Sequence, residues 1–167
     1  DELDITASTL PTWLELEDNS NGTATLAGTP ENAYVGDHGV VLRVTDESGA
    51  FAVQSFVISV ENTNDAPVFV SEAITTATED AEYSYIVIAE DVDEGDELVI
   101  TASTLPDWLE LEDNGNGTAT LDGTPENEDV GNHAVVLRVT DESGVFAVQS
   151  FMISVENTND APVFTSD

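Results

Sequence analysis

The chain repeats itself with a period of 95 residues. Residues 1–72 align with residues 96–167 without a gap, and 60 of the 72 aligned positions are identical. A period of this size is typical of one β-sandwich domain and is too long for a short solenoid repeat. Near-identity between neighbouring copies is typical of recent duplication in long tandem arrays. We therefore expect one fold to be used twice.

The complete copy spans residues 66–160 and alternates apolar with polar residues. Alternation with a period of two predicts strands that bury one face. Gly, Pro, Asn and Asp separate the alternating segments, and no stretch keeps the 3.6-residue period of a helix. Seven strands are predicted, at residues 66–71, 82–90, 97–103, 105–111, 118–122, 133–141 and 146–155. The predicted core residues are Tyr83, Tyr85, Val87, Ala89, Val135, Leu137, Val139, Phe151, Ile153 and Val155.

These patterns predict an all-β chain of tandem antiparallel sandwiches. Residues 1–65 form an incomplete copy that lacks the two opening strands, and residues 161–167 begin the next repeat. Two explanations of the incomplete copy stay open. Either the chain has been trimmed, or another molecule supplies the missing strands. In the second case, Ala161–Ser166 could serve as the donated opening strand, added to an exposed sheet edge.

Charge limits the partners of this chain. It has 35 Asp and Glu against 2 Lys and Arg, which gives a formal net charge of -33. Nucleic acid is excluded as a partner, because nothing would neutralise its phosphates, and an anionic membrane surface is disfavoured in the same way. Such a chain repels itself when compact, so bound divalent cations or a saline medium are expected. The absence of cysteine excludes disulfides and thiolate metal sites.

Two acidic stretches could bind a cation. The nonapeptide Glu61–Phe69 places oxygen-bearing side chains before a proline, and it returns as Glu156–Phe164. Residues 79–97 contain nine acidic residues and no Lys or Arg. Within them, Asp91 and Asp93 share one side of a strand end. Carboxylates within ~4 Å repel by roughly 1 kcal/mol in water and by several times more near a low-dielectric surface. Ca²⁺ binds such oxygens in irregular geometry; the alternative is a solvated, salt-adapted surface.

Several motifs resemble known repeats. Val139–Gly144 and the linker Asn159–Phe164 resemble the end of a cadherin repeat, and Ala89–Gly95 resembles the cadherin calcium motif Ala-x-Asp-x-Asp-x-Gly. Leu105–Leu109 and Leu121–Gly131 are similar to the dystroglycan-type cadherin-like, or Putative Ig, repeats of large bacterial surface adhesins. Together the motifs cover nearly the whole chain. Their order and spacing make the resemblance specific.

The resemblance implies calcium sites at both ends of the complete repeat. One site joins two repeats, and its implied ligands are Glu61, Asn62, Asn64, Asp65, Asp91, Asp93 and Asp141. The other would meet a following repeat, with Glu79, Asp80, Glu156, Asn157, Asn159 and Asp160 as implied ligands. The linker here is Glu-Asn-Thr-Asn-Asp-Ala-Pro, whereas cadherins commonly have Asp-x-Asn-Asp-Asn-Ala-Pro.

The resemblance also implies a function. The chain would be a calcium-stiffened extender or adhesion segment of a long extracellular, membrane-associated bacterial protein, and not an enzyme. Its partners would be neighbouring repeats, with a homophilic or carbohydrate ligand as a candidate. No apolar run approaches the ~18 residues needed to cross a membrane, so this segment is not expected to insert.

Two alternatives remain at this stage. The chain could be a calcium-dependent carbohydrate-binding module, with Trp108 stacking on a sugar ring. Exposure of that indole separates this alternative from the extender, because a buried indole cannot stack on a ligand. The chain could instead be a spacer attached to an enzyme.

Overall fold

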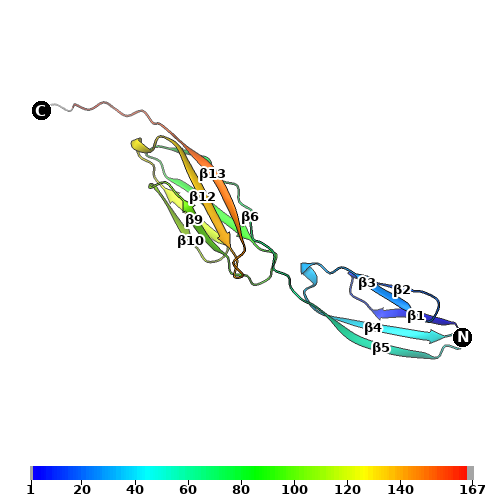
Figure 1. Cartoon of the computed structure of the whole chain (residues 1–167). Coiled ribbons are helices and arrows are strands. Elements are labelled where there is room, and N and C mark those ends of the chain that lie inside the picture. Colours follow the sequence, from blue (N-terminus) through cyan, green and yellow to red (C-terminus); the bar gives the residue numbers. More distant parts are fainter. Residues whose placement is uncertain (1, 165–167) are drawn as a thin grey trace. The chain divides into compact units, whose positions relative to one another are not determined.

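The computed structural model describes residues 2–164. The chain divides into two compact units, Asp1–Thr63 and Asn64–Asp167 (Figure 1). Residues 161–164, part of the predicted start of a next repeat, have no regular secondary structure, and residues 165–167 lie outside the described residues. Within residues 2–164, every helix is too short or too polar to cross a bilayer.

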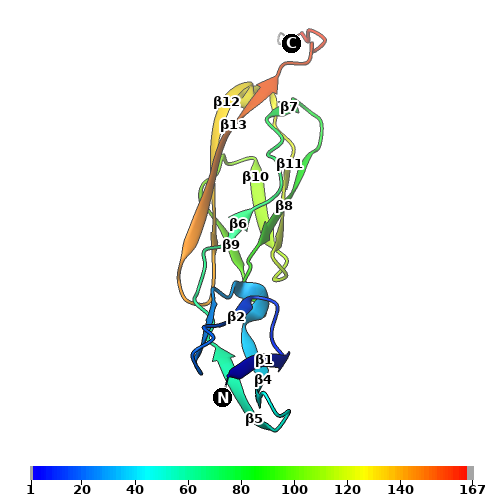
Figure 2. The same ribbon diagram turned by 90° about the vertical axis from the view of Figure 1, so that its right-hand side faces the viewer.

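The second unit is a sandwich of two four-stranded sheets. One sheet has the order β10-β11-β8-β6 and the other the order β7-β13-β12-β9, and Figure 2 shows β12 and β13 facing β8, β10 and β11. The elements are β6 (Val68–Phe69), β7 (Thr76–Thr78), β8 (Tyr83–Glu90), β9 (Val99–Thr104), β10 (Leu109–Asp113), β11 (Thr118–Gly123), η2 (Asn127–Asp129), β12 (Gly131–Thr140) and β13 (Phe146–Glu156).

The core of this unit lies between the two sheets. Strand β8 alternates strictly between buried and exposed residues, as its sequence predicts. Of the predicted core residues, Phe151 is half-buried against the core and the other nine are buried. Leu137, Val139 and Ile153 have no exposed surface, which confirms their assignment to the interior.

The structure corrects three details of the predicted strands. Strand β7 was not predicted, because Thr76–Thr78 is too short to show alternation. It pairs with β13 in parallel, whereas the sequence predicted an antiparallel sandwich throughout. The predicted strand 105–111 begins only at Leu109, because Leu109 N–H donates to the Pro106 carbonyl (3.1 Å) in a turn that precedes β10.

The first unit contains fewer strands. One sheet has the order β1-β4-β5 and the other pairs β2 with β3. Its elements are β1 (Leu3–Thr9), β2 (Leu14–Asp18), β3 (Ala24–Gly28), η1 (Asn32–Tyr34), β4 (Gly36–Asp46) and β5 (Phe51–Val60). They correspond to β9–β13, and counterparts of β6, β7 and β8 are not among residues 2–61.

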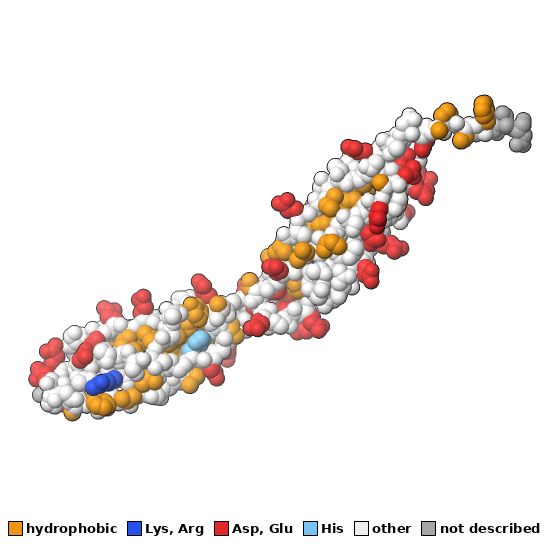
Figure 3. Space-filling model, turned by 180° about the vertical axis from the view of Figure 1, so that it is seen from behind, with side chains coloured by type: hydrophobic (Ala, Val, Ile, Leu, Met, Phe, Trp, Pro, Cys, Tyr) orange, Lys and Arg blue, Asp and Glu red, His pale blue; other side chains and the backbone are white. Residues whose placement is uncertain are grey.

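This smaller set of strands leaves much apolar surface uncovered. Among the described residues of the first unit, Leu14 and Val40 are the buried core hydrophobic residues, whereas the second unit has a cluster of 15. Figure 3 shows hydrophobic side chains at the surface of this unit, with acidic side chains around them. One sheet therefore packs on the other without closing the core.

The buried phenol of Tyr83 makes the stability of the second unit depend on pH in the alkaline range. Its side chain is 4% exposed and its hydroxyl donates to the Ile74 carbonyl (2.8 Å). Burial, with a smaller contribution from Tyr85, raises the pKa of Tyr83 to about 12 from 10.0. The fold therefore favours the neutral phenol. This contribution to stability is complete below pH 10 and is lost as the pH rises from about 10 to about 12.

We expect the free energy of unfolding to fall by on the order of 2 kcal/mol between pH 9.5 and 11.5 through this group. The measurement is urea unfolding across that range for the wild-type chain and for Tyr83→Phe, which cannot ionise. The variant should start less stable, because it loses the hydrogen bond, but should show a smaller alkaline decline. An identical decline in both proteins would show that ionisation of Tyr83 does not cause the alkaline loss of stability.

Candidate metal centres

A group of carboxylates gathers where strand β8 ends. We call Asn64, Asp65, Asp91, Asp93, Asp96 and Asp141 the linker-end cluster. Asp91 and Asp93 directly follow β8, and Gly95 has φ +101, a value that favours glycine and turns the chain so that Asp96 faces the other two. One carboxylate oxygen from each of these three aspartates lies within 4.8 Å of the others.

Hydrogen bonds hold several other oxygens of the cluster. The Asp93 carboxylate accepts the Asp65 N–H (2.7 Å), and the Asp91 carboxylate accepts the Asp93 N–H (3.0 Å). Asp141 follows β12 and accepts the Val145 N–H (2.8 Å) through Oδ1. Its Oδ2 accepts the side-chain amide of Asn64 (2.9 Å). Asn64 therefore contacts Asp141 through its side-chain N–H, and Asn64 is the donor.

The donor set of the linker-end cluster fits a hard cation. Oδ2 of Asp91 and Oδ2 of Asp96 are buried and accept no hydrogen bond, although a buried acceptor normally has a partner. Asp93 is 5% exposed. Arg138, the one basic side chain of this unit, lies over the Phe146 ring (3.9 Å to the centroid). Carboxylate oxygens of this kind are the ligands that Ca²⁺ prefers.

The electrostatic environment of the linker-end cluster also favours a bound cation. Burial raises the pKa of Asp96, and repulsion from Asp91, Asp93 and Asp141 adds to the effect. The hydrogen bond from Asn64 lowers the pKa of Asp141 and keeps that carboxylate ionised. The ionised form of Asp96 is therefore disfavoured in this cluster, and a bound divalent cation would stabilise it.

A second group of carboxylates lies beyond the opposite end of β8. One oxygen each from Glu79, Asp80 and Asp160 lies within 4.8 Å of the others. We call these three residues the C-terminal cluster. Asp80 has φ +62, and its N–H donates to the Pro125 carbonyl (2.9 Å), which holds the residue in this unusual conformation. Asn127 donates its side-chain amide to Asp160 (2.6 Å).

Glu79 is the residue of this cluster that fits a cation best. It is 2% exposed, and its Oε1 is buried without a hydrogen-bond donor. Its backbone N–H donates to the Glu156 carbonyl (3.0 Å), so β7 and β13 hold it in place. Asp80 and Asp160 are exposed. A cation held here would therefore be bound by one buried carboxylate and two at the surface.

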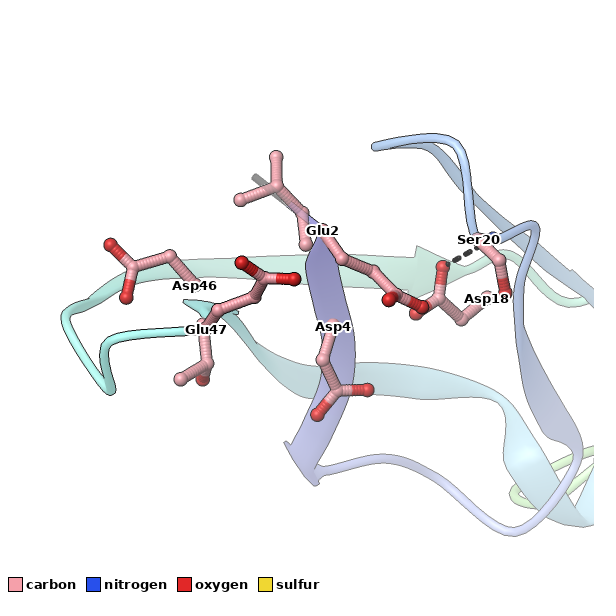
Figure 4. Close-up of a pocket in the computed structure, with 8 residues that line it drawn as sticks. Glu2, Asp4, Asp18, Ser20, Asp46 and Glu47 are labelled. Atoms are coloured by element: carbon pink, nitrogen blue, oxygen red, sulfur yellow. Dashed lines mark hydrogen bonds between the residues drawn. The ribbon is translucent and has the colours of Figure 1, made fainter.

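The first unit has an acidic pocket of a different kind. A cavity of about 310 Å³ is lined by Glu2, Asp4, Asp18, Asp46 and Glu47 among others (Figure 4). Asp18 accepts the N–H groups of Ile5 (2.9 Å) and Ser20 (3.0 Å), which lower its pKa. Asp46, the counterpart of Asp141, accepts from Ser48 and Ala50. Backbone donors thus reach the carboxylates of both Asp18 and Asp46.

Comparison with known proteins identifies the family of both units. A family model described as Putative Ig domain matches residues 1–61 and again residues 66–156. The chain belongs to the Putative Ig domain family. Each unit therefore carries one family repeat, and the linker-end cluster begins in the gap between the two matches. No curated protein matches the chain.

Solved structures resemble these Putative Ig repeats over nearly their whole length. The protocadherin GammaB4 extracellular domain is 23% identical, with a TM-score of 0.69, over 99% of this chain and 28% of that chain. Protocadherin Gamma B2 extracellular cadherin domains 1–5 are 15% identical, with a TM-score of 0.71, over 99% and 34%. These likenesses show a cadherin-like fold.

An endo-fucoidan hydrolase from glycoside hydrolase family 107 is also similar to the Putative Ig repeats. It is 28% identical, with a TM-score of 0.51, over 95% of this chain and 24% of that chain. The chain thus spans about a quarter of the hydrolase. The match concerns a part of that protein.

The structure brings together some of the predicted ligands and separates others. Asn64, Asp65, Asp91, Asp93 and Asp141 meet in the linker-end cluster, and Glu79, Asp80 and Asp160 meet in the C-terminal cluster. Glu61 and Asn62 belong to the first unit and are exposed after β5. The other three predicted ligands are exposed, namely Glu156, Asn157 and Asn159, and Glu156 is not among the grouped carboxylates.

Sequence reasoning missed Asp96 as a ligand candidate. It belongs to the same acidic run as Asp91 and Asp93, but it stands three residues after Asp93, off the period of the strand. The signal that could have identified it is Gly95, since a glycine turn at that point returns the chain toward the preceding carboxylates.

Trp108 bears on the carbohydrate alternative. Its ring packs edge-on against Tyr83 (centroids 5.8 Å apart) and against His133 (5.9 Å), and its indole N–H is buried. His133 in turn hydrogen bonds the Asp129 carbonyl (2.6 Å) through Nε2. The half-buried indole is thus part of the packing of this repeat.

Proposed function

We propose that these Putative Ig repeats are a calcium-stiffened extender or adhesion segment of a long extracellular protein. The observation that carries the proposal is the set of buried carboxylate oxygens without donors: Asp91 Oδ2, Asp96 Oδ2 and Glu79 Oε1. Ca²⁺ at the linker-end cluster would be held by Asp91, Asp93 and Asp96. Asp141 stands beside them, and the main chain of Asp65 is bonded to Asp93.

The position of the linker-end cluster supports a mechanical role. Asp65 belongs to the segment that directly follows the first unit, and its N–H is bonded to a carboxylate of the proposed site. An ion that neutralises Asp91, Asp93 and Asp96 would tighten this attachment, because their mutual repulsion would be removed. The exposed residues Glu61 and Asn62, four and three residues before Asp65, are proposed to complete the coordination.

The extracellular setting rests on the neighbours and on the chain itself. The protocadherin structures are described as extracellular domains, and this chain shares their fold. Millimolar Ca²⁺ outside cells would satisfy a weak site built from exposed and buried carboxylates. The segment would contact neighbouring repeats of its own protein and would act without catalysis.

The hydrolase similarity favours one second candidate, a spacer or carbohydrate-contacting module attached to a polysaccharide-degrading enzyme. It can be tested by incubating the chain with immobilised fucoidan, with Ca²⁺ and with EDTA. Retention in Ca²⁺ alone would favour the carbohydrate-binding module. Free passage in both conditions would exclude direct fucoidan binding.

Small-angle X-ray scattering tests the stiffening. Addition of Ca²⁺ to chelator-treated protein should lengthen and sharpen the distance distribution, because a fixed junction samples fewer bent arrangements than a free one. The control is the same titration with Mg²⁺, which fits irregular carboxylate sites poorly. An apo profile that already matches the Ca²⁺ profile would contradict the mechanical role and leave ion binding itself intact.

Substitution of Asp93 tests the assignment of ligands. Asp93→Asn removes a charge at the linker-end cluster, so calorimetry should show fewer Ca²⁺ ions bound per chain while the sandwich stays folded. Asp80→Asn should remove binding at the C-terminal cluster instead. The matched control is Glu112→Gln, which removes one exposed charge on β10 opposite Thr120, and Thr120 pairs with Ile86 at the middle of β8. Unchanged stoichiometry in Asp93→Asn and Asp80→Asn would refute the assignment.

A further inference from the structure

One outer face of the second unit carries no acidic side chain. It is the outward side of β9, β12 and β13, formed by alternate residues of 99–103, 132–140 and 146–154, and we call it the acid-free face. The residues between these positions are directed toward the core. Four apolar side chains of this face are each at least 50% exposed, namely Val99, Phe146, Val148 and Met152. Exposed apolar surface that is gathered on one face is typical of an interaction site.

The outer face of the opposite sheet has the charge that is usual for this chain. Glu110 and Glu112 project from β10, and Asp122 projects from β11. On the acid-free face the one charged side chain is Arg138, which lies over the Phe146 ring and donates its Nε–H to the Thr140 hydroxyl (3.1 Å). Both of these partners are on the same face, so the guanidinium lies along the surface of the sheet. The two outer faces of one sandwich therefore differ in charge.

Differences between the two copies follow the same division. The second unit has Val99 and Asn132 where the first unit has Asp4 and Asp37, and both positions lie on the acid-free face. Four other positions gain an acid relative to the first unit, and all four lie off this face, namely Asp107, Asp122, Glu128 and Asp129. Across the aligned positions, the second copy thus gains acids elsewhere and loses them only on this face.

Charge decides which class of partner suits such a face. A basic partner would be attracted to the acidic faces and would gain nothing from a face without acids. An acidic partner would be repelled by the acidic faces and would approach the acid-free face with the least repulsion. A second copy of this chain is such a partner, since its net charge is -33. Two acid-free faces in contact would bring no carboxylates of these faces together.

We propose that the acid-free face pairs with the same face of a second copy of this chain, with the two sheets stacked face to face. The face belongs to a four-stranded sheet, and β12 has ten residues. Strands ~4.8 Å apart and ~3.3 Å of length per residue give roughly 500 Å² per copy. A pair would bury roughly 1,000 Å², which is the lower limit for a specific interface, so the pairing is weak and reversible.

The test uses the full chain in EDTA, because this pairing goes beyond the proposed calcium sites and does not depend on them. Sedimentation equilibrium at up to roughly 1 mM protein should show a reversible dimer. Its association constant should rise with added NaCl, since salt screens the repulsion between two acidic molecules. NMR of the isotope-labelled chain should show concentration-dependent shifts at residues 132–140 and 146–154, and little change at residues 110–122.

Two variants place acids on the face. Val148→Glu should weaken the dimer at least about tenfold, because each copy would bring a carboxylate into the contact. Ile86→Glu is the matched control and should dimerise like the parent, since Ile86 lies on the opposite sheet and is 52% exposed, against 50% for Val148. Val99→Asp combined with Asn132→Asp should also weaken the dimer. This variant should fold, because the first unit has aspartate at both equivalent positions.

Four results would overturn the proposal. The first is a chain that stays monomeric at roughly 1 mM protein in high salt. The second is equal weakening by Val148→Glu and Ile86→Glu, which would show that net charge and not one face controls association. The third is a set of concentration-dependent shifts confined to residues outside the acid-free face. The fourth is a monomer that binds fucoidan and loses this binding in Val148→Glu, which would assign the face to an anionic polysaccharide.

Discussion

Addition of Ca²⁺ to chelator-treated protein should raise the melting temperature of the second unit by roughly 10–20 °C at a free ion concentration of about 100 times the dissociation constant. Ligand that binds only the folded state stabilises it by about 2.7 kcal/mol at that ratio. For a domain of this size, each kcal/mol shifts the midpoint by roughly 4–8 °C. The gain arises because Asp91, Asp93 and Asp96 repel one another in the folded state and lose that repulsion on binding.

Scanning calorimetry with EDTA, Ca²⁺ and Mg²⁺ makes the measurement. The first unit supplies an internal reference, because its acidic pocket uses backbone donors at Asp18 and Asp46 and should respond much less. Asp93→Asn should reduce the shift of the second unit. Equal melting temperatures in EDTA and Ca²⁺ would remove calcium from the proposed function. An equal shift of the melting temperature with NaCl at the same ionic strength would show that charge screening, and not Ca²⁺ binding, causes the effect.

Truncation of one leucine should affect the two units very differently. Leu137→Ala should lower the free energy of unfolding of the second unit by about 2–5 kcal/mol, because a fully buried leucine leaves a cavity. Its midpoint should fall by more than about 10 °C. Leu42→Ala deletes the same side chain at the equivalent position of the first unit. It should cost less than about 1.5 kcal/mol there, because Leu42 borders an apolar groove and already contacts solvent.

Each unit has its own reporter for this comparison, Trp13 in the first and Trp108 in the second. Fluorescence in Trp13→Phe and Trp108→Phe backgrounds separates the two transitions. Comparable losses for Leu42→Ala and Leu137→Ala would mean that the first unit is closed in solution.

Much of the second unit follows from its sequence. Alternation in residues 82–90 predicts a strand with one buried face, and β8 has that pattern. The confirmed predictions share one property, which is that a local period determines which side of the strand meets the core. Strand β7 lacks such a period, and its parallel pairing with β13 joins segments about 80 residues apart. No local pattern carries that information.

Some residues of the candidate site can likewise be predicted from local sequence, and others only from the fold. Asp91 and Asp93 are recognisable because a two-residue spacing at a strand end places them on one side. Asp96 joins them only through the turn at Gly95, and Asn64 meets Asp141 only after the fold brings residues 77 positions apart into contact. Exposure of a ligand candidate is also a tertiary property. The sequence ranks Glu79 with Asp80, whereas the structure buries Glu79 and exposes Asp80.

The amino-acid sequence alone determined that this chain is all-β, repeats at 95 residues and concentrates carboxylates at strand ends, because composition and local period are properties of neighbouring residues. The tertiary structure alone decided which carboxylate oxygens are buried without donors and how completely each apolar side chain is covered. Sixty identical positions cannot distinguish Leu42 from Leu137. The difference between them is the presence of β8, a strand that lies far from both in sequence and covers only one.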